Sequence, residues 1–232
     1  MSTAIQTVKE TPLLFQPDMV RATLEDRKNQ TRRTRGLEKI NADKGAWRYD
    51  GVNINGDHLF FNVHAAISGH DPQDCALIIK CPYGKAGDLL WGRETWRVVE
   101  REPDMVDGIL YAADKTFIPI ENTPEAAGRW VIANNNGKHG DHWRPSIFLP
   151  RWASRITLEI TDVRVERLQD ITQEDIAAEG FRAYTPEASP QLHGIAREQF
   201  AEGWNKINAK RGYSWDSNPW VWVISFKRIE SR

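Results

Sequence analysis

Residues 220–226, with the sequence Trp-Val-Trp-Val-Ile-Ser-Phe, place large apolar side chains on both faces of an extended segment. Successive residues of a β-strand point to opposite sides of its sheet. A strand with this pattern must therefore be buried on both sides, as in a sheet or barrel wall that helices cover. A chain of 232 residues is long enough to build such a layered core.

A strand with a change of phase is predicted upstream of this segment. Apolar residues alternate with polar ones from Ile156 to Ile160, and Val163 and Val165 then continue in the opposite phase. A β-bulge near Asp162 would produce this change.

The remaining patterns are short. Further strands are predicted over residues 12–15, 59–63 and 89–96. Helices are predicted over residues 17–25, 173–179 and 195–207. The middle helix has the clearest ends, because Thr172 and Asp175 form a capping-box pattern and Gly180 supplies a stop.

The order of these elements favours an α+β fold. Strands and short helices mix without a repeated βαβ unit, which favours a central, largely antiparallel β-barrel with short helices over its openings. We expect a single domain over residues 12–229, with insertions at about 41–75 and 100–145 and a flexible tail at 1–11. Both insertions are predicted to be rich in loops, since residues 41–58 are dense in Gly, Asn and Asp and residues 134–137 form a turn signal.

Composition and charge exclude several classes of protein. Hydrophobic residues make up 40% and charged residues 27%, which is typical of a soluble globular chain. The net charge of −1 argues against a protein coated with positive charge for bulk binding of nucleic acid. A local basic cleft is compatible with this charge, although a solvated face would have the same composition. The basic residues of one short segment are Arg27, Lys28, Arg32, Arg33, Arg35 and Lys39.

Cysteine usage and hydropathy indicate a reducing cytoplasmic location without a membrane partner. Residues 1–10 lack the apolar core of a signal peptide, and no apolar run approaches the length of a membrane span. Cys75 and Cys81 are too few for a secreted disulfide scaffold. Their spacing, with that of His139 and His142, does not fit a zinc site, so we expect no metal and no cofactor.

The basic segment resembles a known signature. Residues 27–33, Arg-Lys-Asn-Gln-Thr-Arg-Arg, resemble the ASCH signature Gly-Arg-Lys-Thr-x-Thr-x-Arg, with Asp26 in place of the usual Gly and Asn29 in place of the first Thr. The turn at residues 85–88 and the segments 168–180 and 223–227 resemble later landmarks of the same family. The layout is most similar to longer ASCH proteins of phages and prophages. The resemblance implies a PUA-like β-barrel, in the host cytoplasm if the chain is phage-encoded.

The same resemblance implies a reaction. Some small ASCH proteins are amidohydrolases that remove the acetyl group from N(4)-acetylcytidine, and their proposed catalytic residues correspond to Lys28, Thr31 and Glu179. Amide hydrolysis needs a nucleophile, a base that takes its proton and an acid for the leaving amine. A helical turn would put Lys28 and Thr31 on one side, whereas an extended segment would put them on opposite faces.

Binding without chemistry is the alternative that the sequence leaves open. Lys28 and Thr31 could instead contact a backbone phosphate of a nucleic acid, and the ten tryptophans could supply platforms for bases or simply fill the core. In either case the expected partner is a nucleoside or a nucleic acid, RNA rather than DNA, and the sequence carries no signal for an oligomeric state. The residues expected to bind the substrate are Arg27, Arg32, Arg33, Trp91, Arg93 and Glu94.

Overall fold

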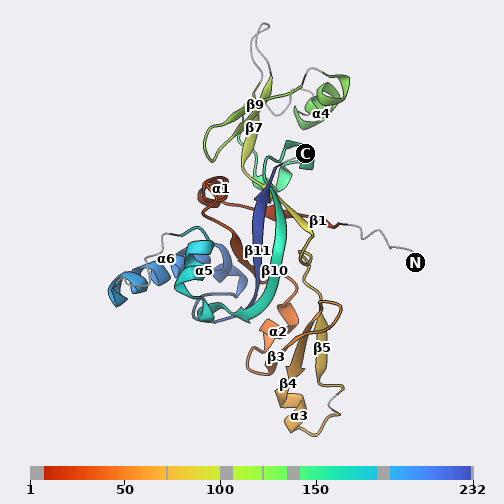
Figure 1. Cartoon of the computed structure of the whole chain (residues 1–232), viewed down its shortest axis with the longest axis vertical. Coiled ribbons are helices and arrows are strands. Elements are labelled where there is room, and N and C mark those ends of the chain that lie inside the picture. Colours follow the sequence, from red (N-terminus) through yellow and green to blue (C-terminus); the bar gives the residue numbers. More distant parts are fainter. Residues whose placement is uncertain are drawn as a thin grey trace, which may run out of the picture.

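The computed structural model describes residues 8–71, 73–99, 107–121, 123–134, 142–181 and 189–230. Its central element is a five-stranded sheet with the strand order β1-β6-β10-β11-β2 (Figure 1). The strands are β1 (Glu10–Leu14), β6 (Leu89–Arg93), β10 (Thr157–Arg167), β11 (Trp220–Ile229) and β2 (Gln30–Arg33). β1 and β6 run parallel, and the other neighbours are antiparallel.

The sheet confirms the α+β class but not the closed barrel. Within the described ranges, β1 and β2 each pair with one neighbour only, so both strands are open edges. The Arg33 guanidinium donates a hydrogen bond of 3.2 Å to the carbonyl oxygen of Leu14, at the end of β1. A side chain thus connects the two edges, where a closed barrel would have a ladder of backbone hydrogen bonds.

Both faces of β11 are covered, as its sequence requires. On one face, Trp222 and Ile224 pack with residues of α1 (Pro17–Leu24) and α2 (Glu38–Ala42). On the other face, Val221 and Val223 pack with α5 (Gln173–Ala178) and α6 (Pro190–Asn208). The β10–β11 pair lies at the centre of the molecule, with α5 and α6 beside it and the sheet of the first insertion beyond α2 (Figure 1).

The local signals along β10 and α5 are confirmed. The β10–β11 register shifts between Ile160 and Asp162, which is the predicted bulge. The capping box forms as expected: Thr172 accepts from the backbone N–H of Asp175, and the Asp175 carboxylate accepts from that of Thr172. Gly180 ends the helix with a φ of 87°, a left-handed conformation that favours glycine.

The first insertion contains more structure than the sequence predicts. A three-stranded antiparallel sheet forms from β3 (Trp47–Val52), β4 (His58–Asn62) and β5 (Ala76–Ile79), with α3 (Val63–Ile67) between the last two strands. β4 matches the predicted strand, but the prediction of a loop over residues 41–58 is wrong. Burial alternates along the whole of β3, and Trp47-Arg48-Tyr49-Asp50 alternates apolar with polar residues, but this short pattern lies among the Gly, Asn and Asp residues on which the loop prediction rested.

The second insertion also forms a sheet. β7 (Trp96–Val99), β8 (Gly108–Tyr111) and β9 (Phe117–Pro119) pair in that order, and α4 (Pro124–Asn134) follows. The prediction of a loop-rich segment is therefore wrong for this part, and the turn expected at 134–137 lies mostly outside the described residues. These strands are too short to give a clear period in the sequence, and their core is completed by Leu149 from a later segment.

The remaining elements are single turns of 3₁₀ helix. They are η1 (Ser146–Phe148), η2 (Arg151–Ala153), η3 (Leu168–Asp170) and η4 (Ala209–Arg211). At the N-terminus, residues 1–7 lie outside the described part, and β1 begins at Glu10, inside the segment predicted as a tail. No helix of the described residues is long and apolar enough to cross a membrane.

Replacing Ile224 by Ala tests the two-sided burial of β11. Ile224 is fully buried, so the substitution should lower the free energy of unfolding by about 2–5 kcal/mol through lost apolar contacts and a cavity. The matched control is Ile54→Ala, at a fully exposed position, which should change it by less than about 0.5 kcal/mol. Urea denaturation followed by tryptophan fluorescence measures both. Equal effects of the two substitutions would contradict the burial of β11.

Candidate functional site

The turn after α1 presents Lys28 to the interior. The N–H of Arg27 donates to the carbonyl of Ala22 at 2.8 Å, and the N–H of Asp26 donates to that of Thr23 at 3.2 Å. This is a Schellman motif, in which Asp26 takes the left-handed conformation, with a φ of 56°. Besides glycine, Asp is among the few residues that adopt this conformation readily.

The Lys28 ammonium is buried and fully hydrogen-bonded. Its side chain has no exposed surface, and Nζ lies 2.7 Å from Oε2 of Glu179. Nζ also donates to the carbonyl oxygens of Glu179, at 2.9 Å, and of Gln30, at 2.7 Å. An ammonium has three donors, so all of them are used. Burial lowers the pKa of Lys28, while the charge of Glu179 and the hydrogen bond to it act in the opposite direction.

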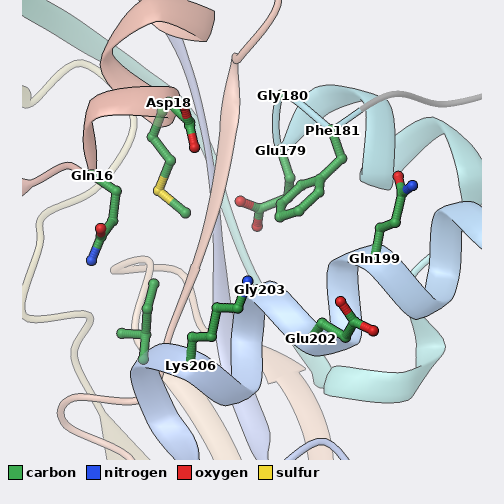
Figure 2. Close-up of a pocket in the computed structure, with 11 residues that line it drawn as sticks. Gln16, Asp18, Glu179, Gly180, Phe181, Gln199, Glu202, Gly203 and Lys206 are labelled. Carbon is green, nitrogen blue, oxygen red and sulfur yellow. The ribbon is translucent and has the colours of Figure 1, made fainter. Parts of the chain in front are cut away.

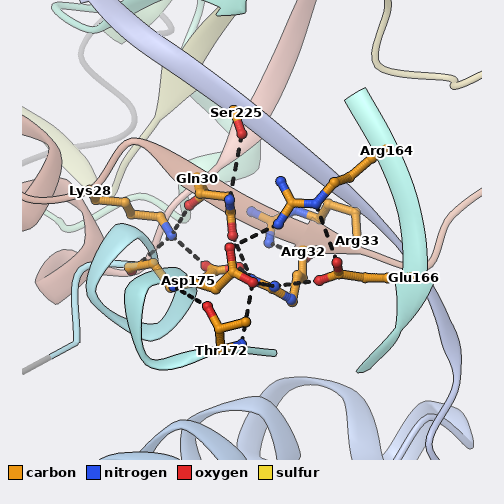
Figure 3. Close-up of polar contacts among 10 residues, drawn as sticks. Lys28, Gln30, Arg32, Arg33, Arg164, Glu166, Thr172, Asp175 and Ser225 are labelled. Carbon is orange, nitrogen blue, oxygen red and sulfur yellow. Dashed lines mark hydrogen bonds and ion pairs between the residues drawn. The ribbon is translucent and has the colours of Figure 1, made fainter. Parts of the chain in front are cut away.

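A second buried cation, Arg32, extends the pair into a network (Figure 3). Its Nη1 contacts Oε1 of Gln30 at 2.7 Å and Oε1 of Glu179 at 3.4 Å. Its Nη2 contacts Oδ2 of Asp175 at 2.9 Å and the carboxylate of Glu166. Arg164 donates to the same two acidic residues from the outside, so that Asp175 lies between two guanidinium groups.

The charges of this network change the proton affinity of Asp175. Burial alone would raise the pKa of Asp175, but the charge of Arg32 and further hydrogen bonds outweigh it and hold the pKa below its usual value. Asp175 therefore has two functions, as the capping residue of α5 and as a counter-charge for the buried arginine.

Close approach of three backbone segments brings Lys28 and Glu179 together. Glu179 follows the last residue of α5, and its backbone forms an isolated antiparallel bridge with that of Lys28. A Cβ atom at Gly180 would lie 2.8 Å from Cβ of Ala22 and 3.1 Å from Cβ of Lys28. Glycine at this position is therefore needed for the contact as well as for the end of the helix.

Thr31 does not join this pair. It lies in β2 opposite Ile224, and alternation along the strand puts it on the other face from Gln30 and Arg32. Its Oγ1 is buried and has no hydrogen-bond partner within the described part of the chain. The segment is extended and not helical, so the structure does not form the Lys28–Thr31 dyad that the hydrolase interpretation needs.

The other residues expected to bind substrate are dispersed. Arg27 donates to the carbonyl of Gly180, beside the pair, whereas Arg33 lies at the sheet edge with Thr31. In the described part of the chain, Trp91, Arg93 and Glu94 line neither of the two pockets, of about 740 and about 30 Å³, that Glu179 lines.

Their contacts indicate structural roles. The Arg93 guanidinium packs over the Trp91 ring at 4.6 Å. Glu94 is buried and forms two hydrogen bonds of 2.8 Å with Arg155, which also binds Asp114. Burial raises the pKa of Glu94, and the bonds to Arg155 oppose that rise.

A pocket of about 740 Å³ opens beside the Lys28–Glu179 pair. Glu179 and Phe181 point into it from the end of α5, and side chains of α6, of the first turn of α1 and of Gln16 just before α1 close the other walls (Figure 2). Its lining residues are Gln16, Asp18, Met19, Glu179, Gly180, Phe181, Gln199, Glu202, Gly203, Lys206 and Ile207. Of the predicted catalytic residues, Glu179 alone lines it.

Sequence reasoning missed part of this site. Gln30 could have been found if residues 30–33 had been recognised as a strand, because residues two apart in a strand lie on the same face and Gln30 therefore shares its face with Arg32. Asp175 was identified only as a capping residue, and nothing in the sequence indicates that Glu166 pairs with Arg32 or that Phe181 lines a pocket with Gln16 and Met19, more than 130 residues away in each case. Among the described residues, no group of three or more His, Cys, Asp or Glu could hold a metal ion, and His139 lies outside them.

The pH dependence of the free energy of unfolding tests the role of Asp175 as the counter-charge of Arg32. Folding lowers the pKa of Asp175. The ionised carboxylate therefore stabilises the folded state at pH values above the usual pKa of Asp, about 3.9. This stabilisation is lost as the pH falls through the lowered pKa of the folded state. Near neutral pH, Asp175→Asn should therefore lower the free energy of unfolding by about 2 kcal/mol. The difference from wild type should shrink as the pH falls below about 4.

The measurement is urea denaturation at a series of pH values. The control is Asp43→Asn, an exposed carboxylate whose removal should change stability little at any of them. A difference between wild type and Asp175→Asn that is independent of pH would contradict the assignment.

Comparison of the chain with protein-family models, curated proteins and solved structures found no match.

Proposed function

We propose that the pocket beside Glu179 binds the base of a nucleoside or of a nucleic-acid strand, RNA rather than DNA, in a PUA-like fold of the ASCH type. The observation that carries this proposal is the position of the Glu179 carboxylate. It lies in the wall of a pocket of about 740 Å³ and is held there by two buried cations, Lys28 and Arg32.

The held carboxylate suits recognition of an exocyclic amine. Carboxylates accept hydrogen bonds from the amino group of cytosine. Each carboxylate oxygen has two lone pairs, and the cations use part of this capacity. Because Lys28 and Arg32 fix the orientation of Glu179 before a ligand arrives, little side-chain entropy is lost on binding.

Phe181 supplies an aromatic surface in the same pocket. Its ring packs against Phe200 edge-to-face, with 5.4 Å between the centroids, and against α6 at Gly203. A Cβ atom at Gly203 would lie 2.9 Å from Cζ of Phe181, so glycine leaves room for the ring. Stacking on such a ring accepts any base, whereas Glu179 would select for an amine.

Binding is better supported than catalysis because of the state of Lys28 and Thr31. A lysine base must first lose a proton and then reach the nucleophile. All three donors of Lys28 are committed to protein acceptors, and the Thr31 hydroxyl is buried on the other face of β2.

Hydrolysis of an acylated amine on a cytosine nucleoside is the second candidate. The lowered pKa of Lys28 favours it, since a desolvated lysine is a common general base. Glu179 would then orient that base or carry a proton to the leaving amine, and Thr31 would have to reach the pocket by a change in β2.

Replacing Phe181 tests the binding proposal. Phe181→Leu keeps the apolar volume but removes the ring, and it should weaken binding of cytidine and of single-stranded RNA by about fivefold or more, the value of one lost stacking contact. Phe148→Leu removes an exposed ring elsewhere on the protein and is the matched control. Titrations at low salt measure both, and absence of binding to cytidine, RNA and DNA under these conditions would overturn the proposal.

Incubation with N(4)-acetylcytidine separates the two candidates. We expect binding without release of cytidine above the uncatalysed rate. Thr31→Val should leave stability unchanged or raise it, because the hydroxyl that it removes is buried without a partner. Turnover that is lost in both Lys28→Ala and Thr31→Val, with their folds intact by circular dichroism, would establish hydrolysis instead.

A further inference from the structure

A second pocket, of about 400 Å³, lies at the two open edges of the central sheet. Pro12, Leu13 and Leu14 of β1 line one side, and Arg32 and Arg33 of β2 line another. The place where the sheet fails to close is therefore a cavity.

Positive charge dominates this cavity. Its lining includes Arg32, Arg33, Arg35 and Arg211, and none of its lining residues is Asp or Glu. Arg32 is neutralised by the buried network, and Arg33 donates to backbone carbonyls. Arg35 and Arg211 are exposed and form no ion pair within the ranges that the structure describes. Two guanidinium groups thus face the cavity without a counter-charge.

These arginines share the cavity with a tyrosine. Tyr83 lines the same pocket and is largely buried, and burial raises the pKa of its hydroxyl. The positive charges of Arg33, Arg35 and Arg211, which line the same pocket, act on the pKa of this hydroxyl in the opposite direction. Several guanidinium groups and a phenol around one cavity form a set of donors suited to a phosphate, because guanidinium groups bind its oxygens in pairs.

The two pockets belong to one cleft. Gln16, Met19 and Ile207 line both of them. A narrow space of about 30 Å³ that Arg33 and Glu179 both line lies between them. A ligand whose base lies beside Glu179 would therefore extend toward the arginines.

We propose that Arg33, Arg35, Arg211 and Tyr83 bind the phosphate group of the nucleotide whose base lies beside Glu179. This inference rests on the proposed function and narrows its ligand from a nucleoside to a nucleotide, either free or within a strand.

Titration with cytidine, cytidine 5′- and 3′-monophosphate, inorganic phosphate and a short oligocytidylate tests the inference on the full chain. One of the monophosphates should bind more tightly than cytidine. Arg35→Ala and Arg211→Ala should each weaken that binding by about tenfold, the effect of losing a hydrogen bond to a charged group, and leave cytidine binding unchanged.

Two matched variants control for net charge. Lys210→Ala removes the same charge one residue before Arg211, and Lys39→Ala does so in the basic segment of Arg35; neither residue lines the cavity. Both controls should bind every probe as the wild type does. All four side chains are exposed, so circular dichroism should show an unchanged fold.

The probes distinguish the two sources of phosphate. If the phosphate belongs to a strand, the oligocytidylate binds more tightly than the monophosphates. The slope of log affinity against log salt then falls by about 0.7 for each phosphate contact that an arginine variant removes. If it belongs to a free nucleotide, a monophosphate binds at least as tightly as the oligomer.

The possible results separate this inference from the proposed function. Arginine-dependent binding of phosphate or monophosphate without measurable cytidine binding supports the phosphate site and contradicts the base site. Equal affinity of cytidine and both monophosphates, no effect of either arginine variant, an equal loss in the lysine controls, or no binding of any probe would each overturn the phosphate site.

Discussion

The burial of Arg32 is the constraint on which the site depends. Its side chain is 1% exposed, and an unpaired guanidinium in such a position would cost far more than a small domain can tolerate. Three carboxylates supply the compensating charges: Glu166 from β10, Asp175 from α5 and Glu179 from the C-cap of α5. The docking of α5 on the sheet is thus tied to charge neutralisation as well as to its apolar face, and the position of Glu179 at the pocket follows from it.

The edges of the central sheet remain open, in contrast to its covered centre. Helices and the insertion sheet cover the faces of the β10–β11 pair, but β2 has only four residues and ends at Arg33. Arg33 meets the end of β1 through a side-chain contact and not through strand pairing. The opening that remains is lined by arginines. In the proposed binding mode the open edge is part of the ligand cleft, and a closed barrel would have replaced that cavity with backbone hydrogen bonds.

The extended conformation of residues 28–33 is the main support for the proposal of binding over hydrolysis at the basic segment. In an extended segment Gln30 and Arg32 share a face with the buried network, and Thr31 faces the opposite core, next to Ile224. A lysine with three protein acceptors and a threonine with none are poorly arranged for proton transfer between them. The same arrangement fixes a carboxylate at a pocket wall, which is what selective binding requires.

The sequence alone determined the features that depend on nearby residues. The apolar pattern of β11, the phase change at Asp162 and the capping box of α5 each involve local periodicity or local hydrogen bonds, and all were predictable. β4 of the first insertion was also predicted, but the other strands of the two insertions were not, because β3 lies among turn-forming residues and the rest have only three or four residues each.

Only the tertiary structure decided which of the basic residues are buried, which meet Glu179, and that Arg211 joins Arg35 at the sheet edge. These outcomes depend on contacts between residues far apart in the chain. Charge neutralisation and packing select such contacts together, and neither leaves a periodic signal in the sequence.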